Sequence, residues 1–388
     1  DHDGALGPIE EALAAFRQVG DRRGEAWALQ NLAWIAFASG RAADAESRLG
    51  EAAATFTEVG DSGGLTWTFG LLAFVRFYEG RLDDAVDLAT QVRRESERRG
   101  DKWGEGMMMI ILGSVELWAG RTGAAVETLQ RSVAIFRELG DTLGRVQALA
   151  ALGRSLVMSG EVDRGLDALA EALRFDPSAP MLDDGGLVGL TSLLVRVQLG
   201  GAGLDDDGLD IALAHLSTGH PEVGAPQLDL GVATAIGLAQ ADRLDEATGL
   251  LETLGTGGEP ASASFAAARA LVSAASRHVE HLADDVARVR AHPSATYLDR
   301  ALAALAEGLA SASGAHAQPA PNAVSSARAS FDVARAEVDP TEDVLAAATV
   351  ALAAAIAAES LGHADGTVRR AAAEAMWERL GVDPHGWR

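Results

Sequence analysis

The sequence contains no cysteine and a single lysine, and histidine is absent from residues 3–214. Without cysteine the chain has no disulfide, no thiol nucleophile and no cysteine-ligated zinc. The lone Lys102 does not follow the glycine-rich phosphate loop of a P-loop ATPase, and the Gly-x-Ser-x-Gly nucleophile motif is missing. We therefore expect a protein that is not an enzyme and that holds no cofactor.

Basic residues are also scarce, because 32 Lys and Arg face 56 Asp and Glu and leave a net charge of −24. Nucleic-acid binding depends on neutralising phosphates with cations, so no nucleic-acid partner is expected. The longest uncharged apolar run, residues 345–358, is shorter than the roughly 20 residues of a membrane-spanning helix. No amino-terminal signal peptide is visible, so we expect a cytoplasmic protein that does not bind a membrane.

Two glycine positions recur at a spacing of 40 residues through the first half of the chain. A Gly-Asp pair begins at residues 20, 60, 100 and 140, and a second glycine occurs at residues 40, 80, 120 and 160. Glycine adopts the left-handed conformation that ends a helix, and the aspartate after it can cap the next helix. The stretches between the glycines carry apolar side chains at the spacing of an amphipathic helix. The unit is a helical hairpin whose copies must stack to bury their apolar faces, and the predicted fold class is all-α.

This unit resembles the tetratricopeptide (TPR) repeat. Its first helix carries Leu29, Leu32 and the small Ala33, its second helix carries the small Ala45, and similar residues recur at the 40-residue spacing. The unit is longer than the usual TPR of about 34 residues and lacks the closing proline. In length it is closer to the TPR regions of large bacterial multidomain regulators. The resemblance implies an α-solenoid with a right-handed superhelical twist.

Composition and phase divide the chain into four parts. These parts are regular repeats over residues 1–175, degenerate helical hairpins over 176–310, a small polar loop over 311–324 and Ala-rich helices over 325–388. Residues 5–16 match the second helix of a unit, so the pattern starts in the middle of a repeat. We therefore expect the C-terminal part of a longer protein, and the alternative is a natural half-repeat that caps the array.

Aromatic residues are concentrated on the concave face that the TPR resemblance implies. Eight of the 20 positions on this face are Trp, Phe or Tyr, in a chain that is 5% aromatic. The residues predicted to line a groove are Trp27, Gln30, Trp34, Phe37, Trp67, Phe74, Phe77, Tyr78, Met107, Trp118, Gln147 and Arg154. Each aromatic side chain buries about 150–250 Å². Together they would exceed the apolar patch of roughly 300–600 Å² on a typical soluble monomer, so something is expected to cover this face.

Three kinds of occupant could cover the groove: the chain's own C-terminal helices, a peptide or small-molecule ligand, or a second copy in a dimer. We expect a non-catalytic protein-interaction or sensor region of a bacterial multidomain regulator, whose partners include its own upstream domains. One alternative is a stand-alone receptor for a small molecule or peptide, with a pocket rimmed by Gln30, Gln147 and Arg154. Another alternative is a constitutive scaffold.

His278, His281 and Asp285 are the strongest candidates for metal ligands. Their spacing would place all three on one helix face, where they could bind a divalent cation. Such a bound cation would allow the chain to act as a metal-dependent enzyme. Three such residues without a recognised motif are more typical of a solvated face. The sequence therefore predicts no metal site.

Overall fold

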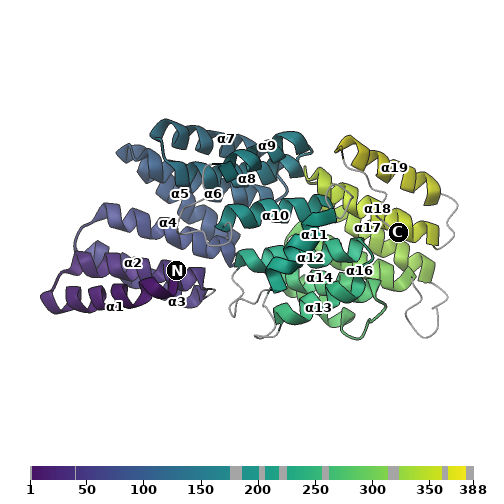
Figure 1. The fold of residues 1–388 in the computed structure, drawn as a ribbon, viewed down its shortest axis with the longest axis horizontal. Coiled ribbons are helices and arrows are strands. Elements are labelled where there is room, and N and C mark those ends of the chain that lie inside the picture. The colour runs from purple at the N-terminus through teal and green to yellow at the C-terminus, as the bar shows by residue number, and fades with distance from the viewer. Residues whose placement is uncertain are drawn as a thin grey trace.

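The computed structural model describes residues 2–39, 41–174, 186–200, 206–217, 225–255, 262–312, 323–360 and 366–381. These residues form helices joined by turns, with no strand among them, so the described chain is all-α (Figure 1). The helices of the regular repeats are α1 (His2–Val19), α2 (Arg22–Ala38), α3 (Ala42–Glu58), α4 (Ser62–Tyr78), α5 (Leu82–Arg99), α6 (Lys102–Trp118), α7 (Thr122–Leu139), α8 (Thr142–Met158) and α9 (Val162–Arg174). The later helices are α10 (Gly186–Gly200), α11 (Asp206–Ser217), α12 (Ala225–Gln240), α13 (Leu244–Gly255), α14 (Ala263–Ala275), α15 (Leu282–Ala291), α16 (Tyr297–Ala312), α17 (Ala323–Val338), α18 (Val344–Ser360) and α19 (Gly366–Arg379).

An aspartate begins each first helix of the 40-residue unit. Its side chain accepts a hydrogen bond from the backbone N–H three residues later, which satisfies a donor that the start of a helix leaves open. The pairs and their distances are Asp21–Gly24 (2.9 Å), Asp61–Gly64 (3.0 Å), Asp101–Gly104 (2.9 Å) and Asp141–Gly144 (2.6 Å). The glycine before each aspartate has a φ between +67° and +75°. This Gly-Asp pair therefore ends one helix and begins the next.

The glycine within the first turn of these helices also allows two helices to approach closely. A Cβ atom on Gly64 would lie 2.3 Å from a ring carbon of Phe56, which stands in the preceding helix α3. Equivalent glycine–phenylalanine contacts recur in two other units, and at Gly104 the side chain of Ser96 takes the place of the ring. The close contact therefore fixes how the second helix of one unit meets the first helix of the next.

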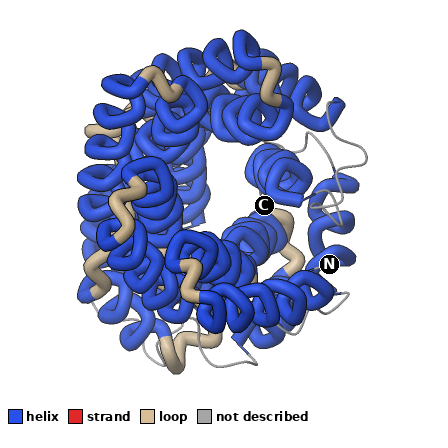
Figure 2. Tube along the Cα trace, turned by 90° about the vertical axis from the view of Figure 1, so that its left-hand side faces the viewer, coloured by secondary structure: helices blue, strands red, loops and turns tan. Residues whose placement is uncertain are grey.

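Consecutive helices pack against each other throughout, and a second set of contacts links every other helix. Each even-numbered helix from α2 to α18 contacts the next even-numbered helix, so these helices form one continuous row through the regular and irregular parts of the chain. Seen from the end of the molecule, the helices follow a curve around a central region (Figure 2).

The C-terminal helices return to the regular repeats. Helix α18 contacts α8, and the turn before α18 joins the turn between α6 and α7. The Glu342 N–H donates a hydrogen bond to the Gly120 carbonyl (2.8 Å), and the Thr122 hydroxyl donates one to the Glu342 carbonyl (3.1 Å). A Cβ atom on Gly120, whose φ is +75°, would lie 2.6 Å from Thr341, so a larger residue would not fit. The largest apolar cluster accordingly combines side chains of α6–α10 with those of α14–α19.

Among the helices described, none is both long enough and apolar enough to cross a lipid bilayer. The regular repeats run to the end of α9, and the proline-containing break at residues 176–180 lies outside the described residues. Helix α16 extends to residue 312 and α17 starts at residue 323, so helices occupy both ends of the loop predicted at 311–324. The rest of that loop lies outside the described residues.

Candidate functional site

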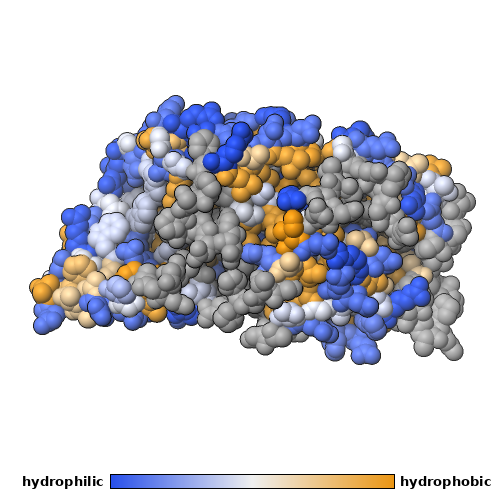
Figure 3. Space-filling view, viewed as in Figure 1, coloured by the Kyte–Doolittle hydropathy of each residue, from blue (hydrophilic) through white to orange (hydrophobic). Residues whose placement is uncertain are grey.

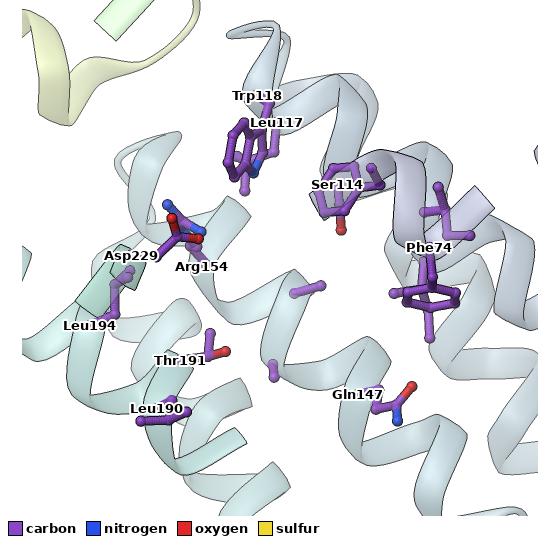
Figure 4. Close-up of a pocket in the computed structure, with 15 residues that line it drawn as sticks. Phe74, Ser114, Leu117, Trp118, Gln147, Arg154, Leu190, Thr191, Leu194 and Asp229 are labelled. Carbon is purple, nitrogen blue, oxygen red and sulfur yellow. The ribbon is translucent and has the colours of Figure 1, made fainter. Parts of the chain in front are cut away.

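A cavity of about 100 Å³ lies between the regular repeats and the helices that follow them. Helices α4, α6 and α8 form one wall, and α10 and α12 form the other (Figure 4). Ten of the lining residues are apolar, and the polar ones are Ser114, Gln147, Arg154, Thr191 and Asp229. On the molecular face shown in Figure 3, apolar side chains gather around α9 to α12, while the upper rim is mainly hydrophilic. The cavity thus has an apolar body with a small number of polar groups.

Helical spacing explains why residues of the regular repeats reach the cavity. In α6, Ile110, Ser114 and Leu117 follow one another at intervals of three or four residues, which places them on one helix face. In α8, Gln147 and Arg154 are about two turns apart and therefore also share a face. Both faces look toward α10 and α12.

One end of the cavity carries two opposite charges, Arg154 from α8 and Asp229 from α12, whose side chains lie next to each other (Figure 4). Burial raises the pKa of the Asp229 carboxyl to about 6, the positive charge of Arg154 opposes this rise, and the negative charge of Asp299 adds to it. Among the described residues, none forms a hydrogen bond or ion pair with Asp229. None of them forms a hydrogen bond with the buried Nε of Arg154 either. The guanidinium of Arg154 and the carboxylate of Asp229 therefore both face the cavity without forming an ion pair with each other.

A buried hydrogen-bonded pair lies close to Arg154. The Tyr297 hydroxyl donates a 2.6 Å hydrogen bond to Asp343 Oδ2, and Asp343 Oδ1 accepts another from the Ala346 N–H at 3.0 Å. Burial raises the pKa of both the tyrosine and the carboxyl, and the charge of Arg154 acts in the opposite direction on each. Because both oxygens of Asp343 have partners, this pair holds α16 against the start of α18 and is part of the framework of the cavity.

The structure brings five of the 12 predicted groove residues to the cavity, namely Phe74, Phe77, Trp118, Gln147 and Arg154. The rings of Phe77 and Trp118 meet edge to face, with centroids 5.5 Å apart. Part of this face is covered, because α10 contacts α8 and α12 contacts α10. The cover at this site therefore comes from the helices directly after the regular repeats, whereas the sequence analysis considered the Ala-rich C-terminal helices.

Two other predicted groove residues, Trp27 and Trp67, lie on an exposed edge, where they are 37% and 43% exposed. Trp67 stacks on Trp103 with ring centroids 4.4 Å apart, and the Trp103 indole N–H donates to Asp141 Oδ2 at 3.1 Å. Trp27 meets Phe56 edge to face. Both tryptophans lie in the first half of their helices, α2 and α4. In α4, the residues that line the cavity, Phe74 and Phe77, lie near the other end of the helix.

The remaining predicted groove residues do not line the cavity either. Gln30 is only 2% exposed, and neither of its side-chain polar atoms has a hydrogen-bond partner among the described residues. Trp34 and Phe37 contact each other within α2, and Met107 packs against the main apolar cluster. The expectation that Gln30 rims the pocket is not met, because the cavity begins at α4. The side chain of Tyr78 lies outside the described part of the chain.

The expectation that His278, His281 and Asp285 share a helix face is wrong. His278 lies in the turn after α14, and His281 is the residue before α15, which starts only at Leu282. Both histidines are exposed, whereas Asp285 is fully buried and accepts two hydrogen bonds from the guanidinium of Arg269, at 2.8 and 2.5 Å. No cluster of metal-ligating side chains occurs in the described ranges.

The second wall of the cavity was not predicted from the sequence, and it includes Leu190, Thr191, Leu194 and Asp229. These residues belong to α10 and α12, where the 40-residue pattern no longer holds. The apolar residues at 190 and 194 have helical spacing, but such spacing predicts a buried face without naming its partner. No motif marks Asp229.

Comparison with known protein families finds no match to this chain, and comparison with curated proteins finds no significant match.

Proposed function

We propose that this chain is a non-catalytic recognition module, in which TPR-like repeats form a right-handed superhelix and a small ligand binds in the cavity between α4, α6, α8, α10 and α12. The observation that carries the proposal is the cavity, which has aromatic and aliphatic walls and a few polar groups. This composition is typical of small-molecule sites. The row of even-numbered helices supports the superhelix, because stacked repeats bury their faces against their neighbours.

The size of the cavity favours a small molecule over an extended peptide. An apolar cavity of about 150 Å³ holds a benzene molecule. The present cavity of about 100 Å³ suits a smaller group, such as a four-carbon isobutyl group. Helices α10 and α12 also cover the side along which a peptide would have to lie. A protein partner is therefore better accommodated elsewhere, for example on the edge that exposes Trp27 and Trp67.

The position of the cavity suits a sensor. One wall belongs to the regular repeats and the other to the later helices, so one occupant contacts both parts of the chain. A ligand shifts a conformational equilibrium when it binds one arrangement better than another. In a bacterial multidomain regulator, this change in the contact between the two walls would reach the linked effector domains.

Titration with 3-methyl-1-butanol, a neutral molecule whose isobutyl group has the right size, tests this proposal. Ligand-detected NMR on the intact chain should show saturable binding. The variant Ser114→Leu fills the cavity and should abolish that binding, because Ser114 lines it. The matched variant Ser326→Leu lies on the exposed face of α17 and should bind as the parent does. Absence of binding to the parent, or equal binding by Ser114→Leu and the parent, would overturn the proposal.

A further inference from the structure

We infer that the ligand is a small zwitterion with a branched aliphatic body, the chemistry of a free hydrophobic α-amino acid such as leucine. The inference rests on the proposed function and adds the charge of the ligand to it. Its basis is the arrangement of Arg154 and Asp229 at one end of an otherwise largely apolar cavity.

The two charged groups are close enough to influence each other, since Arg154 acts electrostatically on the carboxyl of Asp229. They nevertheless form no hydrogen bond or ion pair with each other, and the described residues offer no other partner for Asp229 or for the Arg154 Nε. Both residues are half-buried, and charges that lose part of their hydration normally pair and form hydrogen bonds, because an unpaired desolvated charge is costly. The open pair therefore presents one donor group and one acceptor group to the same small space.

A ligand with a single charge would satisfy only half of this end. An anion could bind the guanidinium of Arg154, but its charge would stand next to the carboxylate of Asp229, with Asp299 as a further negative charge nearby. A cation could bind Asp229 but would be repelled by Arg154. An ammonium and a carboxylate on one carbon atom match both groups at once, and each contact is a charge-assisted hydrogen bond.

The rest of the cavity matches the uncharged part of such a molecule. Phe77, Trp118 and Leu194 line it, and the volume of about 100 Å³ suits an isobutyl-sized side chain. A peptide of several residues would exceed that volume and would lack either the free ammonium or the free carboxylate at this end. A free hydrophobic amino acid provides the ammonium, the carboxylate and the branched aliphatic side chain in one small molecule.

Four compounds with the same branched body test the inference on the intact chain at neutral pH. L-leucine carries both charges, 3-methylbutylamine lacks the carboxylate, 4-methylpentanoate lacks the ammonium, and 3-methyl-1-butanol is neutral. We expect a Kd for L-leucine at least about tenfold below that of each other compound, because hydrogen bonds between charged groups are the strong ones. Asp229→Asn should remove the advantage of L-leucine over 4-methylpentanoate, while Asp167→Asn, on the exposed side of α9, should preserve it.

The outcomes separate this inference from the proposed function. If 3-methyl-1-butanol binds in the cavity but L-leucine binds no more tightly, the cavity is a ligand site and the zwitterion is wrong. If one of the singly charged compounds binds tightest, the ligand class is wrong in the same way. If none of the four binds, the proposed function fails as well. The compound series on the parent chain decides the matter even where a variant does not fold.

Discussion

Replacement of Asp229 by asparagine should make the protein more stable at neutral pH while it weakens the proposed site. The carboxyl has a pKa of about 6 in the folded chain, against 3.8 for an ordinary aspartate. A free energy of about 1.4 kcal/mol corresponds to each pH unit between the two values. The charged carboxylate therefore costs the folded state about 2–3 kcal/mol at neutral pH, and asparagine, which stays neutral, does not carry this cost.

The pH dependence of this effect has a defined sign. Burial of Asp229 is the main cause of the raised pKa, Arg154 on α8 opposes it, and Asp299 on α16 reinforces it. The folded chain thus binds the Asp229 proton more tightly than the unfolded chain does, so the contribution of this residue to stability decreases as the pH rises from about 4 to about 6. The advantage of Asp229→Asn over the parent should accordingly shrink as the pH falls and vanish near pH 4.

Urea unfolding followed by far-ultraviolet circular dichroism, at several pH values between about 4 and 7, measures this difference. Asp167→Asn serves as the control, because it makes the same chemical change on an exposed surface and should stay within about 0.5 kcal/mol of the parent. A loss of stability in Asp229→Asn at neutral pH, or a gain that does not depend on pH, would refute the reasoning.

The remaining predictions concern the contacts between helices and the hydrogen bonds that join the Gly120 turn to the Glu342 turn, which we call the closure. Gly64→Ala should lower the free energy of unfolding by about 1–3 kcal/mol, because the new Cβ atom would overlap the ring of Phe56. Gly50→Ala is the control in an open helical position, and it should raise the free energy of unfolding by about 0.5–1 kcal/mol. Urea unfolding measures both values. Asp61→Ala should cost about 0.5–2 kcal/mol at neutral pH. The cap bond from the Gly64 N–H is the main reason that the pKa of Asp61 is lowered, so the stabilisation should disappear as the pH falls through that lowered pKa, and an unchanged cost in acid would contradict this account. Glu342→Ala removes the carboxylate that accepts a 2.7 Å hydrogen bond from the Gly123 N–H in the first turn of α7. Relative to the parent, this variant should show faster amide hydrogen exchange in α18 and unchanged exchange in α3. Unchanged exchange in α18 would contradict the stabilising effect of this contact.

The helices of the regular repeats could be predicted because the chemistry of their boundaries is local. Asp101 binds a backbone N–H three residues away, and Gly120 adopts the left-handed conformation on which its turn depends. Each signal is carried by neighbouring residues and recurs at a fixed spacing. The positions of α2 to α9 therefore follow from the sequence pattern.

The cavity could be predicted only in part, because its second wall depends on the path of the chain after α9. Trp67 and Phe74 are both aromatic and belong to the same helix, yet Phe74 lines the cavity and Trp67 stacks on Trp103 at an exposed edge. Only the placement of α10 and α12 decides between these outcomes. Asp229 was missed for the same reason, since only the fold brings this single aspartate outside the repeat close to Arg154.

The hydrogen bonds between the turn at Gly120 and the turn at Glu342 limit how this protein could change during evolution. An open repeat array tolerates the gain or loss of a whole unit, because each repeat contacts only its neighbours. Here, a duplicated 40-residue unit inserted between α8 and α18 would carry one turn away from the other and leave the donors and acceptors of both without partners. The contact between these turns therefore disfavours the gain or loss of a whole unit between α7 and α18, whereas it places no such limit on units that precede α6.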